Sequence, residues 1–166
     1  MPFLPIGMQP QTCMEPLTAP MPLTPPVFLG GGRMGDVMRS RDWSASPLGL
    51  PAAWPASLRT AVQMLLTCQL PMYIAWGPEF IQFYNDAYAP ILGDKEAGAL
   101  GSRAPDTWSE IWDTIGPMWQ EVHQGRSFGF DDFKLTINRF GYFEDCYFNF
   151  SYSPVPDDHG GVAACW

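Results

Sequence analysis

The side chains in this sequence that could support acid–base or metal chemistry are two pairs of neighbouring carboxylates. Asp131-Asp132 and Glu144-Asp145 flank a stretch that alternates apolar and polar residues and then turns. If that stretch forms a hairpin, the pairs could face each other across it, and clustered carboxylate oxygens can bind a hard cation or share a proton. No nucleophile or partnered base accompanies them, so we interpret them as solvated strand ends and expect no enzyme activity.

The cysteines and histidines do not follow a metal-ligand pattern. The cysteines are Cys13, Cys68, Cys146 and Cys165. They contain no CxxC pair, and their spacing from His123 and His159 matches no zinc signature. We interpret them as free thiols that pack as small hydrophobes. The spacing of the cysteines and histidines predicts no resident metal. The sequence also lacks GxSxG, P-loop, HExxH and GxGxxG motifs, which is a further reason to expect no enzyme.

Charge and hydropathy exclude two classes of partner. The net charge is -8, and residues 84–166 carry 13 acidic against five basic residues. Because phosphate groups are bound by clustered Lys and Arg, we expect neither nucleic acid nor an anionic membrane as a partner. No apolar run is long enough to span a bilayer, and the start lacks a basic segment followed by an apolar one, so we expect a cytoplasmic protein.

The N-terminal third contains an arm and two helices. Residues 1–32 hold eight prolines, which remove backbone donors, and we expect an extended or disordered arm. Residues 33–69 follow as flanking helices. Met34, Val37 and Met38 indicate a short amphipathic helix over 33–41. Apolar residues at spacings of three and four predict a stronger helix over 55–68.

Residues 70–166 predict the core of one domain. Two apolar runs on either side of Gly77-Pro78-Glu79 predict an antiparallel hairpin, and Asn85-Asp86 after it suits a helix start. Three short helices should follow, over 87–92, over 105–115, and from Pro117 to about residue 124, with a loop over 94–104 and an interruption at Gly116-Pro117. Alternation then predicts strands over 133–138, over 142–153 and from about residue 161.

This order of elements and several sequence motifs resemble the PAS domains of bacterial hybrid sensor histidine kinases and the segment that precedes them. The layout is a five-stranded antiparallel sheet with short helices across one face, an α+β fold. The motifs that carry the resemblance are Gly35, Arg39, Asp42-Trp43-Ser44, Pro47-Leu48-Gly49, Trp54-Pro55-Ala56-Ser57-Leu58-Arg59, Ala75-Trp76-Gly77-Pro78, Tyr84-Asn85-Asp86-Ala87-Tyr88, Trp108-Ser109-Glu110-Ile111-Trp112 and Tyr147-Phe148-Asn149-Phe150-Ser151-Tyr152-Ser153-Pro154.

The resemblance implies a sensory module without the kinase's own catalytic parts. Such a module would bind a small, largely apolar ligand and bias a histidine kinase output, and it would form a homodimer through the helices over 33–41 and 55–68. A module that binds no ligand and serves only dimerisation or protein interaction is the alternative. In haem-binding relatives the last central helix carries the proximal histidine, which makes His123 a candidate axial ligand. Because this helix is short and polar, we interpret His123 as an exposed or hydrogen-bonded histidine and expect no cofactor. The cysteine-bearing helix of flavin-photoadduct domains is absent.

In this fold the ligand cavity would lie between the sheet and the central helices. Aromatic and apolar walls with few polar groups suit a small apolar ligand, although each aromatic residue alone would also fit a simple core. The candidate lining residues are Met72, Ile74, Trp76, Ile81, Phe83, Tyr88, Trp108, Trp112, Met118, Trp119, Phe133, Leu135, Phe148 and Phe150.

Overall fold

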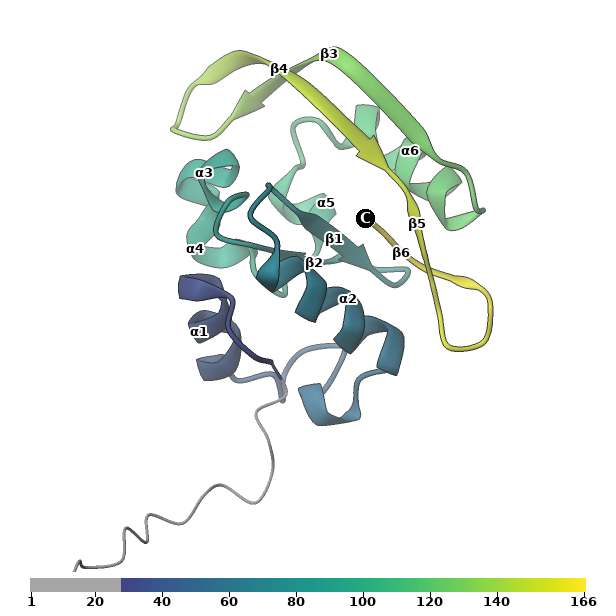
Figure 1. The fold of residues 1–166 in the computed structure, drawn as a ribbon. Helices are drawn as coiled ribbons and strands as arrows, with labels where there is room; N and C mark the ends of the chain where they lie inside the picture. The colour runs from purple at the N-terminus through teal and green to yellow at the C-terminus, as the bar shows by residue number, and fades with distance from the viewer. Residues whose placement is uncertain (1–27) are drawn as a thin grey trace, which may run out of the picture.

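The computed structural model describes residues 28–166, so most of the predicted arm lies outside the described residues. The described chain has the expected α+β composition, with a long hairpin arching over one end of the molecule (Figure 1). Its helices are α1 (Gly32–Ser40), η1 (Pro51–Ala53), α2 (Ala56–Thr67), α3 (Ala89–Leu92), η2 (Gly93–Lys95), α4 (Glu96–Ala99), α5 (Ala104–Thr107) and α6 (Trp112–His123). Its strands are β1 (Tyr73–Trp76), β2 (Ile81–Tyr84), β3 (Phe128–Asn138), β4 (Phe143–Tyr152), β5 (Pro154–Pro156) and β6 (Val162–Cys165).

The strands form two antiparallel sheets rather than the single five-stranded sheet that we expected. One sheet has the order β2-β1-β6-β5, and the other pairs β3 with β4. Only Ser153 separates β4 from β5, and its backbone exchanges two hydrogen bonds with Trp166, at 3.1 and 2.8 Å. The division falls here because β6 pairs with β5 and not with β4, which leaves β3 as the only partner of β4 among the described strands.

The predicted hairpin is confirmed as β1 and β2, but its turn also includes Phe80. Phe80 has a φ of 53°, in the left-handed region where a bulky side chain is strained. Its ring is buried against the indoles of Trp112 and Trp119, with centroids 5.4 and 5.8 Å away. This packing stabilises the strained turn and directs it toward α6.

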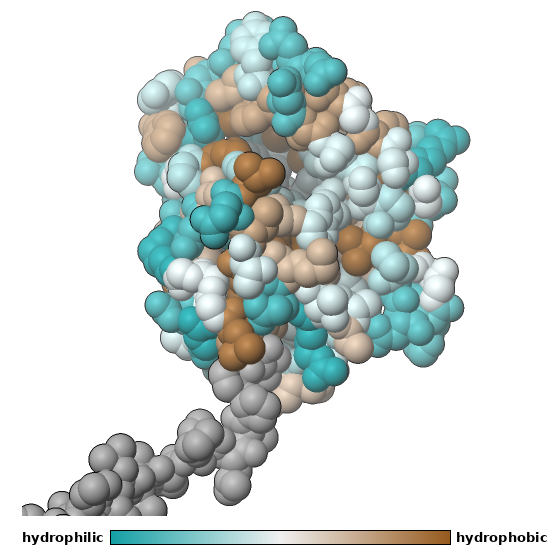
Figure 2. Space-filling view, viewed as in Figure 1, coloured by the Kyte–Doolittle hydropathy of each residue, from teal (hydrophilic) through white to brown (hydrophobic). Residues whose placement is uncertain are grey.

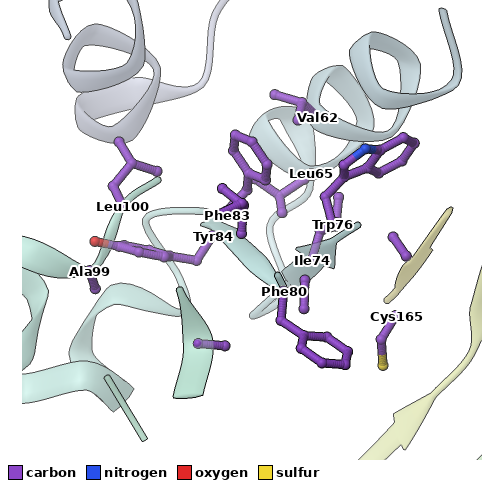
Figure 3. Close-up of a cluster of buried hydrophobic side chains, with 14 of the residues drawn as sticks. Val62, Leu65, Ile74, Trp76, Phe80, Phe83, Tyr84, Ala99, Leu100 and Cys165 are labelled. Atoms are coloured by element: carbon purple, nitrogen blue, oxygen red, sulfur yellow. The ribbon is translucent and has the colours of Figure 1, made fainter. Parts of the chain in front are cut away.

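Helix α2, also confirmed, covers one face of the four-stranded sheet. Its buried row includes Val62 and Leu65, which lie beside Phe83 and Trp76 in Figure 3. Cys165 points away from α2 in the same view. The sheet therefore has one face against the N-terminal helices and a second face toward the central helices.

Two aspartates in turns of the sheet hold α1 and α2 at their N-terminal ends. Gly31 and Pro55 precede these helices and offer no side-chain oxygen to the free amides of the first turn. The carboxylate of Asp86, just after β2, accepts two hydrogen bonds from the first turn of α1 at 2.9 and 2.7 Å. The carboxylate of Asp158, between β5 and β6, does the same for α2 at 3.0 and 2.8 Å. Both helices are thus capped by residues far away in the sequence.

Asn85, expected at a helix start, has a wider role. Its side-chain oxygen accepts hydrogen bonds from the amides of Tyr88 and Met72, each at 3.0 Å. Its side-chain nitrogen donates to the carbonyls of Cys68 and Leu70, at 3.0 and 2.7 Å. Asn85 is buried and satisfies four backbone groups, so it fixes the linker from α2 to β1 against the end of β2.

Two predictions for the central segment were wrong. Residues 94–104 are not a loop, because η2 and α4 lie within them. Helix α6 begins at Trp112 and continues through Gly116-Pro117 to His123 without the expected interruption. A proline removes only one helical donor, and Gly116 lies against the Trp112 indole, where a Cβ would approach the ring to 2.9 Å.

The hairpin of β3 and β4 contains both long strands that the alternation predicts, and β3 also extends back to Phe128. A bulge at residues 131 and 132 interrupts the pairing, and Asp132 there has a φ of 54°. The two carboxylate pairs do not face each other across the hairpin, so that possibility is wrong. Glu144 and Asp145 lie opposite Ile137 and Thr136, at the other end of the hairpin from the bulge.

Candidate ligand-binding site

A hollow of about 280 Å³ lies on the sheet face that α2 does not cover. It is bounded by the residues that lead into β1, by α6, by the end of β4 and by the end of β6. In the view of Figure 2 the surface is hollowed below the hairpin of β3 and β4, and hydrophobic residues gather around the opening. The lining residues are Pro71, Met72, Tyr73, Trp119, Asn149, Phe150, Ser151, Tyr152, Cys165 and Trp166.

Four aromatic side chains, which we call the open cluster, pack together beside this hollow: Tyr73, Trp119 and Tyr152 line it, and Tyr88 packs on Tyr73. The ring of Tyr73 lies 4.9 Å from that of Tyr88 and 5.6 Å from that of Trp119. Trp119 and Tyr152 meet edge to face at 5.6 Å. The three tyrosines are only half-buried, whereas Trp119 is 3% exposed. The cluster therefore presents phenol rings to the hollow around one deeply set indole.

A polar network anchors the open cluster to the sheet. The hydroxyl of Tyr73 donates to the side-chain oxygen of Gln82 at 2.7 Å. The side-chain nitrogen of Gln82 donates to the hydroxyls of Ser102, at 2.7 Å, and Thr107. Gln82 is fully buried, so these bonds are needed to offset the cost of removing an amide from water. They fix the position of Tyr73 and leave its hydroxyl committed as a donor.

The polar side chains of the wall carry no charge, and among them the buried Trp119 indole can only donate a hydrogen bond. The nitrogen of this indole makes no hydrogen bond of normal geometry within residues 28–166, although it lies close enough to the phenol oxygen of Tyr152 to favour the ionised form of that phenol and so lower its pKa against the larger effect of burial. Burial raises the pKa of Tyr88, Tyr152 and Tyr73 well above the ordinary value, so all three phenols are neutral at physiological pH. Burial likewise raises the pKa of the Cys165 thiol to about 12, which makes it unreactive.

Four predicted lining residues lie on the wrong face of the sheet for this hollow. Phe83 stacks on Trp43, at 5.8 Å, under the N-terminal helices. Ile74 is opposite Phe83 in the β1–β2 register, and Trp76 and Ile81 form the next pair on the same face. These side chains are part of the core below α2. The sequence did not distinguish the two faces because both faces of this hairpin are apolar enough to be buried.

The other predicted lining residues divide between the hollow and its surroundings. Met72, Trp119 and Phe150 line the hollow, and Tyr88 contacts its wall. The remaining six do not line the hollow and come from the central segment or from the long hairpin. Those six are Trp108, Trp112, Met118, Phe133, Leu135 and Phe148.

Sequence reasoning missed Tyr73, Gln82, Tyr152 and Cys165 as residues of this site. Tyr73 and Gln82 alternate with the apolar residues that we had assigned to the cavity, so they point to the opposite face. The available signal was a glutamine between Ile81 and Phe83. An amide in the middle of an apolar strand indicates a polar network on one of its faces.

His123 lies away from the open cluster, beside a larger and shallower hollow of about 670 Å³. Its ring stacks on Phe80 at 4.9 Å, and burial lowers the pKa of the imidazole. Asp157 and Asp158 also line this hollow, and both carboxylates already accept backbone hydrogen bonds. This acidic lining does not fit an anionic porphyrin, and residues 28–166 contain no group of three or more ligand side chains that could hold a metal ion.

Comparisons with known proteins do not identify a family for this chain. No protein-family model matches the chain, and a search of curated proteins finds no match either. None of the helices in the described part is both long and apolar enough to cross a membrane.

Proposed function

We propose that residues 33–166 form a cytoplasmic PAS-type sensory module that binds a small molecule in the hollow at the open cluster. Binding, and not catalysis, is its role, and its output is a histidine kinase. The observation that carries the proposal is the hollow itself, which combines accessible aromatic walls with a buried donor that has no partner. Ligand sites have this composition, with few polar groups in a mostly apolar wall.

The strand arrangement supports the PAS assignment. If β4 and β5 are counted as one strand that bends at Ser153, the two sheets become one antiparallel sheet of five strands. The paired hydrogen bonds between Ser153 and Trp166 connect the two parts in that way. Helices α3 to α6 then lie between the second and third strands, which is the layout that the sequence resemblance implies.

The capping aspartates offer a path from the hollow to the flanking helices. Asp158 sits in the turn between β5 and β6, and β6 also contributes Cys165 to the hollow. A ligand that prefers one position of β6 would change the position of the α2 cap. Signal transfer would then be a shift in the population of two helix arrangements.

Native mass spectrometry of the freshly purified full chain tests ligand binding. We expect a small molecule that is retained under gentle conditions and released on denaturation. Cys165→Leu places a larger side chain in the hollow and should reduce the retained fraction, whereas Cys68→Leu, outside the hollow, should not. A parent protein with no retained mass, and with no probe binding in the titration described below, would contradict the proposal.

A ligand-free dimerisation module is a second candidate, favoured by exposed apolar side chains on the flanking helices. Met64 on α2 is 55% exposed and Val37 on α1 is 37% exposed. Light scattering of the full chain tests this candidate. A dimer that Met64→Glu dissociates, and that Tyr142→Glu at the tip of the long hairpin leaves intact, would support it, and a monomeric parent would remove it.

A further inference from the structure

The chemistry of the open cluster restricts what the hollow can bind, and this restriction rests on the proposed function. Trp119 is the central observation, because its indole nitrogen is buried and can only donate a hydrogen bond. Leaving a buried donor unpaired costs about 1–3 kcal/mol, so an occupant that supplies an acceptor gains that free energy.

The remaining polar groups of the wall point to the same kind of occupant. The Tyr152 hydroxyl lies beside the Trp119 indole in the wall, the Tyr88 phenol packs on Tyr73, and both phenols keep their protons at physiological pH. The Tyr73 hydroxyl is already committed to Gln82. Uncommitted groups around the hollow are therefore able to donate to an acceptor atom.

Charge excludes ionic ligands. No Lys, Arg, His, Asp or Glu side chain is among the lining residues. A carboxylate or ammonium placed here would lose its hydration without gaining a partner of opposite charge, and an isolated buried charge is very costly. The occupant must therefore be neutral.

The size and shape of the hollow favour a single flat ring. A dry cavity of about 150 Å³ can hold benzene, and the present hollow, at about 280 Å³, leaves room for a ring with a short substituent. Its walls are aromatic rings that meet at 4.9 to 5.6 Å, and such walls pack well against the face and edge of another ring.

We infer that the hollow binds a neutral, flat, one-ring molecule with a carbonyl-type acceptor, and that Trp119 donates the hydrogen bond that selects it. Tyr152 is the neighbouring donor, and the rest of the wall supplies apolar contact. Trp119, one of the lining residues that the sequence suggested, is thus the residue that selects the ligand.

A titration of the full chain, with ¹⁵N-labelled tryptophan, tests the inference by NMR. The probes are acetophenone, ethylbenzene, which has the same shape without the acceptor, and benzoate, which is charged. The indole resonance missing from Trp119→Phe should move downfield with acetophenone and saturate. Ethylbenzene should bind about tenfold more weakly or worse, and benzoate should not bind. The indole resonances of Trp43 and Trp54, which are already hydrogen-bonded, should not move.

Trp119→Phe and Tyr152→Phe separate the possible outcomes. Trp119→Phe should abolish the preference for acetophenone over ethylbenzene, and Tyr152→Phe should reduce it. Equal binding of acetophenone and ethylbenzene to the parent protein would show that the ligand needs no hydrogen-bond acceptor, while the hollow would remain a binding site. A retained molecule in native mass spectrometry without acetophenone binding would overturn the ligand class alone. If neither a retained molecule nor acetophenone binding is observed, the proposed function is contradicted as well.

Discussion

Two aromatic clusters lie on opposite faces of the four-stranded sheet, and they differ in how their polar atoms are used. The closed cluster, Phe28, Trp43, Trp54 and Phe83, lies under the N-terminal helices and every member is buried. Its rings are 4.9 to 5.8 Å apart, close to the spacing in the open cluster. Ring spacing therefore does not distinguish a core from a ligand site.

The indole nitrogens do distinguish the two clusters. Trp43 donates to the carbonyl of Met38 and Trp54 to that of Gly49, each at 2.9 Å. Trp119 in the open cluster has no such partner among residues 28–166. Two other buried polar atoms, Ser57 Oγ and His123 Nε2, also lack a hydrogen bond of normal geometry in this part of the chain, so the Trp119 indole indicates a binding site only together with the hollow that it borders. The tryptophan-rich sequence therefore contains both core residues and a candidate ligand-binding residue, and composition alone does not separate them.

The largest expected effect is on the closed cluster. Trp54→Ala should lower the free energy of unfolding by about 3–5 kcal/mol, because it leaves a void among buried rings and removes the bond to Gly49. Tyr152→Ala should cost less, about 0.5–3 kcal/mol, since its ring already borders a hollow. Urea denaturation of both variants measures the difference. Equal costs would mean that the two clusters are packed alike.

A matched substitution isolates the hydrogen bond. Trp43→Phe and Trp119→Phe remove the same atoms, but only the first breaks a bond and leaves a buried carbonyl unpaired. Trp43→Phe should therefore be less stable than Trp119→Phe by about 1–3 kcal/mol. The difference is obtained from the midpoints of urea denaturation, which are converted to free energies of unfolding with one common m-value. If Trp119→Phe is the more damaging, its indole has a partner and the distinction between clusters fails.

The closed cluster also depends on the docking of α1 by Asp86. Asp86→Ala should destabilise the protein by about 0.5–2 kcal/mol, because two amides of α1 lose their acceptor. Asp131→Ala, at an exposed position in the β3 bulge, serves as the control and should be near neutral. Hydrogen exchange should show the loss of protection concentrated in α1. Equal effects of the two substitutions would show that the cap does not hold the helix.

A smaller effect should appear in the pH dependence of stability. The Ser57 side chain and the amides of Ser57 and Ala56 lower the pKa of the Asp158 carboxyl. A lowered pKa in the folded state stabilises the protein above the ordinary pKa, and this contribution is lost as the pH falls through the folded-state value. The parent should have a higher free energy of unfolding than Asp158→Asn near neutral pH. This difference should decrease as the pH falls from about 5 to about 3. A constant difference would contradict the proposed linkage.

The sequence predicted the elements that have strong local patterns. The β1–β2 hairpin, α2 and the two strands of the long hairpin follow from apolar periodicity and from turn residues such as Gly77. Local pattern could not assign the faces of β2, because all four of its residues are buried. It also overestimated Pro117 as a helix breaker, since the loss of one donor inside α6 is compensated by packing.

The site was harder to predict than the fold because its contacts are distant in sequence. Tyr73, Trp119 and Tyr152 come from β1, α6 and β4, and no local pattern brings them together. The caps formed by Asp86 and Asp158 likewise join positions 52 and 102 residues apart. Sequence periodicity shows which residues are buried, but only the packed structure shows which donors are left without partners.

Indole hydrogen exchange is the most direct test of the distinction between the two clusters. The account predicts slow exchange for the indole N–H groups of Trp43 and Trp54, with or without acetophenone. It predicts faster exchange for Trp119 in the free protein and slower exchange once acetophenone is added. An indole of Trp119 whose exchange rate does not change when acetophenone is added would contradict the account, because no hydrogen bond would then form between this donor and the bound acceptor.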